Sequence, residues 1–495
     1  MKPDHLAHFA TLSACLLLAG CGGSGTASPD AAVIAPPATV APPVAPFVEL
    51  SFAYEAHRLG TRDVLPPYTY AGVNYPGGVA DIFPQGGIAV DFERDRFPEV
   101  VVPLNKAYAT PAYAALPYVV LSNTSGRLRH DAALNAQLPS VFGARRAAAL
   151  TVAGNPAAFF VAHNVSGIYN DPRAHGTAVL LAQRSGSIGQ VTGAFPRLNT
   201  RDGVSEDAVD AHSMAVGDVN GDGLDDILIG NCNAFGGGYP PLFLLQQADG
   251  RFSARVDPFL ARLLSVPMTN PQSVGNENFN LLLDLHLADL NGDKFADLIA
   301  GFGHGSTPSL LFINKNGQFN FDERQALPAS TYGIDTNLHL ETRSADFDND
   351  GDLDLLIQHS RYVPYYGGNY LQLLRNDNGS FTDITATALS QAESEIKGER
   401  LSWSPNVFVR DLDGDRLVDI VYGINNGRLL VFFNQGGGRF TRMTTALARG
   451  ENGVLLTVAD LDSDGKQDLL YYQYGGSETE KLYFINVYRL DFKKP

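Results

Sequence analysis

Residues 346–354 read DFDNDGDLD, and the prediction of the fold starts from this acidic stretch. Its carboxylates stand at loop positions 1, 3, 5 and 9, which are Asp346, Asp348, Asp350 and Asp354. Negative charges this close together repel one another by about 1 kcal/mol or more per pair unless a cation lies among them. Alternating positions of a curled loop can turn their oxygens inward, and a hard cation with about six to eight oxygen ligands suits such a ring. We therefore predict a calcium site in this loop.

Four further stretches repeat the pattern and begin at residues 218, 289, 411 and 460. Neither Cys nor His falls inside any of the loops, which disfavours zinc and copper. The backbone carbonyl at position 7 is expected as a further ligand, by analogy with the EF-hand. The sequence thus predicts about five structural Ca²⁺ ions. The predicted ligands outside the first-quoted loop are Asp218, Asn220, Asp222, Leu224 and Asp226; Asp289, Asn291, Asp293, Phe295 and Asp297; Asp411, Asp413, Asp415, Leu417 and Asp419; and Asp460, Asp462, Asp464, Lys466 and Asp468, to which Asp352 adds the position-7 carbonyl of the loop at 346.

The segments that flank the loops are typical of strands. AVGD precedes and DILIG follows the loop at 218, while VRD precedes and DIVYG follows the loop at 411. An EF-hand would instead need a helix on each side and a Glu at position 12. A metal-free alternative, in which the Asp residues only form Asx-turns, also fits any single loop. Five repetitions favour the metal.

Each loop belongs to a repeating unit of four expected strands. The loops begin 49 to 71 residues apart, and an apolar strand with a Gly-containing hairpin follows each of the first four, as in LLVFFNQGGGRF. Two units lie upstream. In one, Asp91, Glu93, Asp95 and Glu99 form a weaker candidate metal loop, and in the other the tight turn Gly154-Asn155-Pro156 replaces the loop. Such spacing marks an array of supersecondary units, seven in all.

Four-stranded antiparallel units repeated radially form a β-propeller, so the predicted fold is all-β with seven blades. The last unit lacks a fourth strand, whereas residues 47–54 (FVELSFAY) alternate like a strand and belong to no unit. We expect this N-terminal strand to complete the last blade and close the ring.

The loops D-x-[DN]-x-D-G-x-x-D between strands resemble those of FG-GAP/VCBS-type repeats, the propeller repeats of integrin α-chains and of many bacterial exported proteins. The resemblance covers about residues 47–495, and it implies Ca²⁺ in the hairpin between the first two strands of each blade. Lys294 and Arg416 depart from it, because the usual Gly at position 6 adopts a special backbone angle. Those two sites are therefore the weakest of the five.

The N-terminus has the features of an exported, lipid-anchored protein. Residues 1–20 form an expected signal peptide, and Leu18-Ala19-Gly20-Cys21 resembles the bacterial lipobox with Cys21 as the lipidated residue. An ordinary signal peptide or a short buried helix is the alternative. Residues 21–46, Gly/Ser-rich and then Ala/Pro-rich, form a spacer before the propeller at 47–495. The expected location is the bacterial cell envelope, with the membrane reached only through the lipid.

The composition bounds the possible partners. The formal net charge of −17 argues against nucleic acid, although much of it lies in the five loops. Of the three cysteines, Cys15 leaves with the signal peptide and Cys21 carries the lipid, so Cys232 stands alone and no disulfide framework is expected.

The longer loops should gather on the face opposite the calcium loops, where function is expected on a rigid scaffold. Their aromatic and polar residues suit a glycan or a protein partner. The alternative is that the aromatic rings only pack the loops against one another. The candidates on this face are Tyr239, His304, Arg361, Tyr362, Tyr365, Tyr366 and Trp403.

Histidines on the expected innermost strands offer a different chemistry. His212, His286 and His339 each precede a calcium loop and can line a central channel, although satisfied strand histidines are the simpler interpretation. The leading hypothesis is a non-catalytic binding or scaffold propeller. The alternative is a polysaccharide-active enzyme of the lyase or dehydratase type, for which His304, His339, Arg361 and Tyr366 would have to converge.

Overall fold

The structure, a computed structural model, describes most of the chain from Phe47 to Lys493, and these residues lie in one compact unit, Val44–Pro495. The predicted signal peptide, Cys21 and the spacer lie outside the described residues and stay predictions. The described ranges are 47–61, 63–64, 68–70, 73–75, 79–80, 82–84, 86–106, 118–138, 144–162, 178–184, 186–196, 211–231, 241–263, 266, 281–303, 308–330, 337–361, 367–389, 395–400, 407–424, 428–446, 453–476 and 481–493.

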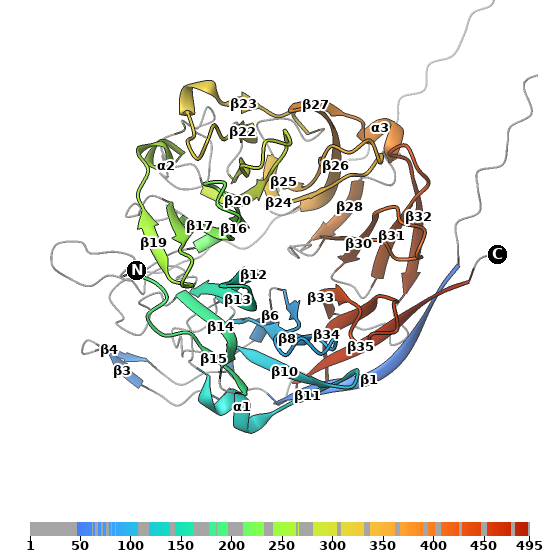
Figure 1. Ribbon diagram of the computed structural model, residues 1–495. Coiled ribbons are helices and arrows are strands. Elements are labelled where there is room, and N and C mark those ends of the chain that lie inside the picture. Colours follow the sequence, from blue (N-terminus) through green and yellow to red (C-terminus); the bar gives the residue numbers. More distant parts are fainter. Residues whose placement is uncertain are drawn as a thin grey trace, which may run out of the picture. The chain divides into compact units, whose positions relative to one another are not determined.

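Seven antiparallel sheets follow one another along the chain, and Figure 1 shows them arranged as a ring. The predicted all-β fold with seven blades is therefore confirmed. Blades 1 to 3 consist of β7 (Ile88–Val90), β8 (Glu99–Val102), β10 (Val119–Thr124) and β11 (Arg127–His130); β12 (Ala144–Val152), β13 (Asn155–Ala162), β14 (Ala178–Arg184) and β15 (Ser187–Gln190); and β16 (Ala211–Gly217), β17 (Asp226–Asn231), β18 (Leu242–Gln246) and β19 (Phe252–Arg255).

The remaining blades repeat the same strand order, from the innermost strand outward. Blades 4 to 7 consist of β20 (Leu281–Ala288), β21 (Asp297–Gly303), β22 (Leu310–Phe312) and β23 (Gln325–Ala326); β24 (Asn337–Ala345), β25 (Asp354–Arg361), β26 (Gly367–Asp377) and β27 (Ser380–Asp383); β29 (Val407–Arg410), β30 (Asp419–Ile424), β31 (Arg428–Asn434) and β32 (Phe440–Ala446); and β33 (Gly453–Ala459), β34 (Asp468–Gly476), β35 (Lys481–Lys493) and β1 (Phe47–Thr61).

The chain also contains short helices and additional short strands. None of the helices in the described part of the chain is long and apolar enough to cross a membrane. The helices are α1 (Ala132–Gln137), α2 (Pro258–Leu263), α3 (Thr385–Ala388) and the 3₁₀ turn η2 (Phe321–Glu323), and the additional strands are β2 (Asp63–Val64), β3 (Tyr68–Tyr70), β4 (Val73–Tyr75), β5 (Val79–Ala80), β6 (Ile82–Pro84), β9 (Leu104–Lys106) and β28 (Glu395–Arg400).

The last blade takes its outermost strand from the N-terminal end of the described chain. β1 pairs antiparallel with β35, from Phe47 opposite Lys493 to Thr61 opposite Leu482, and Figure 1 shows the two strands side by side. The paired strand is longer than the eight residues that the sequence indicates. That this strand locks the ring closed stays a prediction.

The second strand of a blade is apolar on both faces because each blade lies between two others. Along β17, Ile227 packs into the core shared with blade 2, and its neighbour Leu228 packs into the core shared with blade 4. Among the described residues, such a core cluster lies at each of the seven junctions, including the one between blades 7 and 1. This burial explains why strands such as DILIG read as continuous apolar runs rather than as alternating ones.

Glycines in the second strand let the next blade approach closely. A Cβ placed on Gly301 would lie 2.4 Å from Cγ of His339 in blade 5, and one on Gly423 would lie 2.6 Å from Cβ of Leu455 in blade 7. Real Cβ atoms do not make such short contacts. Gly at these positions is therefore required by the spacing between blades.

Candidate metal sites and central cavity

The acidic loops join the innermost strand of a blade to its second strand, as the sequence predicts. They connect β16 to β17, β20 to β21, β24 to β25, β29 to β30 and β33 to β34. Because these strands occupy the same place in every blade, all five loops lie on the same face of the ring. The loop between β7 and β8 lies there as well.

One network of hydrogen bonds recurs in four of the loops, and the loop at 411 keeps it except that Oδ1 of Asp411 accepts the N–H of Gly414. In the loop at 218, Oδ1 of Asp218 accepts the backbone N–H of Asp222 at 3.1 Å and Oδ2 accepts that of Gly223 at 2.8 Å. Oδ1 of Asp222 accepts the N–H of Leu224 at 2.9 Å. These are the bonds of an Asx-turn, yet each carboxylate oxygen keeps a further lone pair for a cation. The network therefore fits both interpretations of the loop, and position 9 separates them.

Two residues per loop adopt left-handed backbone angles. In the loop at 218 these are Gly221 and Gly223 at positions 4 and 6, with φ of 76° and 81°. Lys294 and Arg416, which replace Gly at position 6, have φ of 77° and 74°, and their N–H groups donate to Asp289 and Asp411 as Gly does elsewhere. A non-glycine residue in this region costs about 1–2 kcal/mol. Both loops nevertheless keep the common geometry.

The carboxylate at position 9 is buried and held from two sides. Oδ2 of Asp226 accepts the N–H of Val219 at 3.1 Å, and Oδ1 accepts the N–H of Gln246 in the third strand at 2.8 Å. Burial raises the pKa of Asp226 to about 6, the backbone hydrogen bonds oppose the rise, and the charges of Asp222 and Asp218 add to it. A cation bound among these groups would offset the burial and the repulsion, which an Asx-turn alone does not do.

The same environment recurs at the other four loops. Burial raises the pKa of Asp297, Asp419 and Asp468 to about 7 and that of Asp354 to about 6.

The donor set fits calcium. Three of the loops bring three carboxylate oxygens within 4.8 Å of one another, at Asp346, Asp348 and Asp354; at Asp411, Asp413 and Asp419; and at Asp460, Asp462 and Asp464. Oxygens bound to one Ca²⁺ at about 2.3–2.6 Å lie at most about 5 Å apart, so these clusters have a suitable span. The loops at 218 and 289 offer an Asn oxygen at position 3 instead. A bound ion would tie the two strands of the hairpin together.

The first unit keeps the loop geometry. Asp91 accepts the N–H groups of Asp95 and Arg96, each at 3.0 Å, and burial raises the pKa of Glu99 to about 7. Glu93 is exposed, and the loop is not one of the described three-carboxylate clusters. The weaker metal prediction for Asp91, Glu93, Asp95 and Glu99 stays a prediction.

The turn of the second unit lies one residue earlier than predicted. Val152 pairs with Asn155, so the turn consists of Ala153 and Gly154, with φ of 46° and 75°. Asn155 and Pro156 begin β13. Two positive φ angles define a type I′ hairpin turn, and Pro cannot adopt them because its ring fixes φ at a negative value.

In blade 7, an arginine side chain occupies part of the acidic loop. A guanidinium nitrogen of Arg489 contacts the carboxylate of Asp462 at position 3, and its Nε lies 3.9 Å from Oδ1 of Asp468 at position 9. In blades 3 to 6 this Oδ1 accepts a backbone N–H from the third strand or, in blade 4, from Asn314 just after it. β35 instead runs on to Lys493 opposite β1, and Arg489 takes the place of that amide. This loop therefore fits calcium less well than the others.

A second recurrent device links neighbouring blades, and sequence reasoning missed it. Nδ2 of Asn434, at the end of β31, donates to the carbonyl of Phe347 in the loop of blade 5 at 2.8 Å and to that of Val418 in its own loop at 3.1 Å. We call this arrangement the amide clamp. Equivalent clamps are made by Asn123 to Leu461, Gln246 to Thr151, Asn314 to Val219 and Asn376 to Leu290. The signal was an amide residue just before each Gly hairpin.

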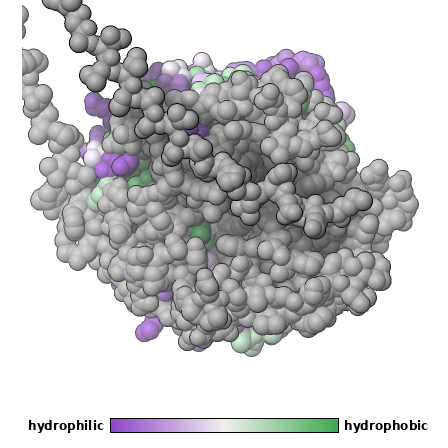
Figure 2. Space-filling model, turned by 180° about the vertical axis from the view of Figure 1, so that it is seen from behind, coloured by the Kyte–Doolittle hydropathy of each residue, from purple (hydrophilic) through white to green (hydrophobic). Residues whose placement is uncertain are grey.

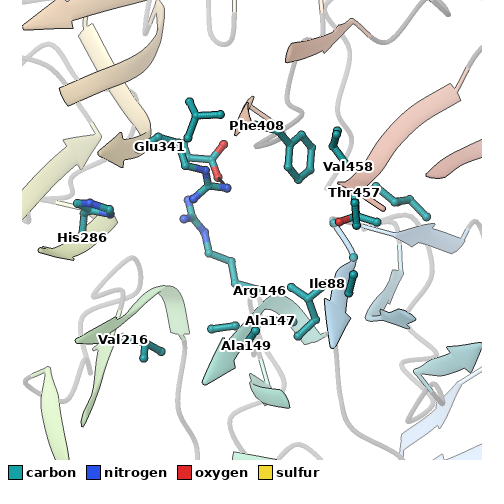
Figure 3. A pocket seen from close by; sticks show the side chains of 18 of the residues that line it. Ile88, Arg146, Ala147, Ala149, Val216, His286, Glu341, Phe408, Thr457 and Val458 are labelled. Carbon is teal, nitrogen blue, oxygen red and sulfur yellow. Dashed lines mark ion pairs between the residues drawn. The ribbon is translucent and has the colours of Figure 1, made fainter. Parts of the chain in front are cut away.

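The innermost strands of all seven blades line a central cavity of about 520 Å³. Charged side chains face it despite the apolar character of much of the wall. Figure 3 shows the Arg146 side chain extending from β12 toward Glu341 across this cavity. Its Nη1 lies 3.0 Å from Oδ1 of Asp284 in blade 4, and its Nη2 donates to the carbonyl of Leu340 in blade 5 at 2.7 Å. Arg146 thus ties blade 2 to blades 4 and 5.

Blade 5 adds a second ion pair at the cavity wall. Arg343 pairs with Glu341, and its Nε donates to the carbonyl of Val407 in blade 6 at 2.9 Å. Burial raises the pKa of Glu341, which Arg343 and Arg146 partly oppose. Burial also acts to raise the pKa of Asp284, but His339 and Arg146 outweigh it and hold this pKa below its usual range.

The three histidines lie on innermost strands, as predicted. His339 is fully buried, and its ring nitrogens lie 2.6 Å from Oγ of Ser309 and 2.7 Å from Oγ1 of Thr342. His286 lines the cavity 2.9 Å from Oγ of Ser344, and burial lowers its pKa to about 4. His212 lies in β16, and its side chain is outside the described set. These histidines are satisfied strand residues in the two cases that the structure describes.

The predicted ligand-face residues lie mostly outside the described residues. Arg361, at the end of β25, is half-buried. Figure 2 shows the molecule from the side opposite to that of Figure 1, and hydrophilic residues gather along the upper edge of this view. The residues that lie outside the described set, and stay predictions, are Tyr239, His304, Tyr362, Tyr365, Tyr366 and Trp403.

Among known structures, this chain is similar to three rhamnogalacturonan lyases. A rhamnogalacturonan lyase YesW matches with 14% identity, and the exotype rhamnogalacturonan lyase YesX and the Bacillus licheniformis rhamnogalacturonan lyase PL11 each match with 11%. Each match covers 86% of this chain and 75% of the other, with a TM-score of 0.41. A search of curated protein sequences finds no match.

Family models match the segments that contain the acidic loops. The FG-GAP-like repeat matches residues 289–357 and 411–471, and the FG-GAP repeat matches residues 211–239. These segments cover parts of blades 3 to 7 and include all five predicted calcium loops. The chain is therefore a seven-bladed β-propeller that carries FG-GAP repeats in these segments.

Proposed function

We propose that this chain is a calcium-stabilised binding propeller, which presents a glycan- or protein-binding surface at the bacterial cell envelope and is held there by lipid on Cys21. The observation that carries the calcium part is the buried position-9 carboxylate. In five loops it lies among other carboxylates, accepts a backbone amide from its own loop and has a raised pKa. Calcium that binds only the folded loop would contribute its binding free energy to folding.

The binding role is supported by the pairing of the charged groups in the central cavity. Arg146 is paired with Asp284, Arg343 with Glu341, and His286 contacts Ser344. General acid–base chemistry needs groups free to exchange protons with a substrate. Paired groups of this kind favour a rigid scaffold, with partners recognised by loops and by the cavity rim.

The test is a binding screen on the purified full-length protein. Glycan arrays and envelope protein fractions are probed in millimolar calcium and again in chelator. Retention of one ligand class with calcium, without any change in the ligand, supports the proposal. Conversion of a bound glycan into product, or binding that is equal with and without calcium, contradicts it.

The anchor has a separate test. Labelled fatty acid should be incorporated into the wild type and not into Cys21→Ser in a bacterial host. Equal labelling of both proteins would remove the lipid anchor from the proposal and leave the propeller unaffected.

A polysaccharide-active enzyme is the second candidate, since two carboxylates and a histidine line one cavity. These residues are Asp284, Glu341 and His286, and the last has its pKa lowered to about 4, so its ring is neutral at pH 7. A lyase of this kind would release unsaturated ends from an acidic polysaccharide. Product formation that is lost in Glu341→Gln, with the melting temperature retained, would favour the enzyme over the binding module.

A further inference from the structure

Blade 7 differs from blades 3 to 6 at the end of its third strand. In those four blades an amide residue, in the third strand or just after it, donates its backbone N–H to the position-9 carboxylate, and its side chain forms the amide clamp. The register of β34 and β35 places Leu490 at the equivalent point of blade 7, with Arg489 directly opposite Asp468. The third strand of blade 7 therefore brings a guanidinium to this carboxylate and no amide side chain.

The guanidinium of Arg489 contacts two carboxylates of the acidic loop. One of its terminal nitrogens pairs with Oδ2 of Asp462 at position 3, and its Nε lies 3.9 Å from Oδ1 of Asp468 at position 9. The two acidic side chains are only 12% and 6% exposed, respectively. The positive charge of Arg489 offsets their burial and their mutual repulsion, which is the electrostatic role of a bound cation. The contact with Asp462 also takes up an oxygen that Ca²⁺ would need as a ligand.

The loop at 346 shows the contrasting arrangement. Oδ1 of Asp348, which stands at position 3 as Asp462 does, is buried and has no hydrogen-bond partner. Oxygens of positions 1, 3 and 9 lie within 4.8 Å of one another in this loop, whereas the cluster in the loop at 460 consists of positions 1, 3 and 5. A buried oxygen without a partner, next to the buried carboxylate of position 9, fits a cation ligand. The loop at 346 thus fits calcium, and the loop at 460 fits its own arginine.

An arginine at the same strand position of blade 5 does not enter its loop. The register of β25 and β26 places Arg375 opposite Asp354, as Arg489 lies opposite Asp468. Arg375 pairs instead with Asp377 of its own hairpin at 2.9 Å. An arginine at this strand position is therefore not sufficient to occupy the loop, and Arg375 offers a matched comparison for Arg489.

We propose that Arg489 takes the place of calcium in blade 7, so that this loop keeps its shape without an ion while the loops of blades 3 to 6 bind one each. The inference rests on the proposed calcium stabilisation and states which blades depend on it. Arg489 is part of the chain and does not dissociate when free calcium falls, whereas a loop with a dissociation constant of about 10⁻⁴–10⁻³ M releases its ion. The blade in which β1 pairs with β35 is thereby independent of calcium.

The test is hydrogen–deuterium exchange of the full-length protein, read by mass spectrometry in chelator and in about 10 mM calcium, a concentration above the affinity range of such loops. Peptides that cover residues 346–354 and 460–468 are compared. Arg489→Gln removes the charge from the loop of blade 7, and Arg489→Lys retains it. Arg375→Gln is the matched control, because Arg375 has the same strand position in blade 5 and pairs with its own hairpin.

The expected result is a different response of the two loops in the wild type. Calcium should slow exchange at 346–354 by about 10- to 100-fold, because the ion binds only the closed loop. Exchange at 460–468 should be equal in the two conditions. In Arg489→Gln, exchange at 460–468 should be faster in chelator and should slow again in calcium, whereas Arg489→Lys and Arg375→Gln should keep the wild-type response at 460–468.

Three outcomes would overturn the inference and leave the calcium part of the proposed function in place. These are calcium protection of 460–468 in the wild type equal to that of 346–354, exchange at 460–468 in Arg489→Gln that matches the wild type, and fast exchange there that calcium does not slow, which makes Arg489 only a structural tie. Absence of any calcium effect at both loops is distinct, because it removes calcium stabilisation itself and the inference with it.

Discussion

Replacing Asn434 with alanine should break the amide clamp between blades 5 and 6. Asn434 is 2% exposed, and its side chain donates to the carbonyls of Phe347 and Val418 and accepts the N–H of Gly436 at 2.9 Å. In Asn434→Ala, the carbonyls of Phe347 and Val418 and the N–H of Gly436 lose this hydrogen-bond partner. Each such group costs about 1–3 kcal/mol, so we expect a loss of about 3–5 kcal/mol in the free energy of unfolding, since water or relaxation will satisfy part of the set.

The assay is denaturant unfolding in saturating calcium. When the variants unfold with the same dependence of free energy on denaturant concentration, a shift in the midpoint reports a change in stability. Gln247→Ala is the matched control: Gln247 is an exposed amide at a hairpin whose side chain bonds only to the same hairpin. This control should change stability by less than about 0.5 kcal/mol. Equal midpoints for Asn434→Ala and Gln247→Ala would refute the clamp as a source of stability.

Three further results are expected. Gly301→Ala should lower the melting temperature strongly because its Cβ would meet the ring of His339 at 2.4 Å, whereas Gly189→Ala, with open space around its Cβ, should not; equal melts would show that the blades can move apart. Arg489→Gln should raise the number of calcium ions retained by about one, since Arg489 occupies Asp462 of the blade 7 loop, and unchanged metal content would contradict this. Without calcium, the folded state binds protons more tightly than the unfolded chain at carboxyls such as Asp419, whose pKa rises from 3.8 to about 7, so stability should fall as pH rises through this range; a calcium-free melt higher at about pH 8 than at about pH 5.5 would contradict it.

Local regularity made the fold and the acidic loops predictable from the sequence. The loop D-x-[DN]-x-D repeats between apolar strands, and each recurrence adds an independent indication of the same unit. The seven blades and the strand connections follow from that count. The turn consists of Ala153 and Gly154 rather than Gly154-Asn155-Pro156, because its two residues need positive φ angles, which Pro cannot adopt.

Contacts between distant units were not predictable in the same way. Arg146 reaches Asp284 and Leu340 across the cavity, and nothing in the sequence near Arg146 indicates a partner 138 residues away. The simpler interpretation of the histidines, as satisfied strand residues, is confirmed for His339, whose ring nitrogens contact Ser309 and Thr342. The residues of the amide clamps are indicated by the sequence, because an Asn or Gln precedes each hairpin at a fixed place. The carbonyl that each amide binds lies in the neighbouring blade, and the sequence around the amide does not identify it.

Calcium stabilisation of the propeller is tested most directly by a thermal melt of wild type and Asp350→Ala, in chelator and in millimolar calcium, with the metal content measured on the same samples. Asp350 holds the middle of the loop at 346 by accepting the N–H of Asp352 at 3.0 Å. We expect retained calcium, a large calcium-dependent rise in melting temperature for the wild type, and a smaller rise and one fewer ion for the variant. Identical melts with and without calcium, with no ion retained, would contradict it.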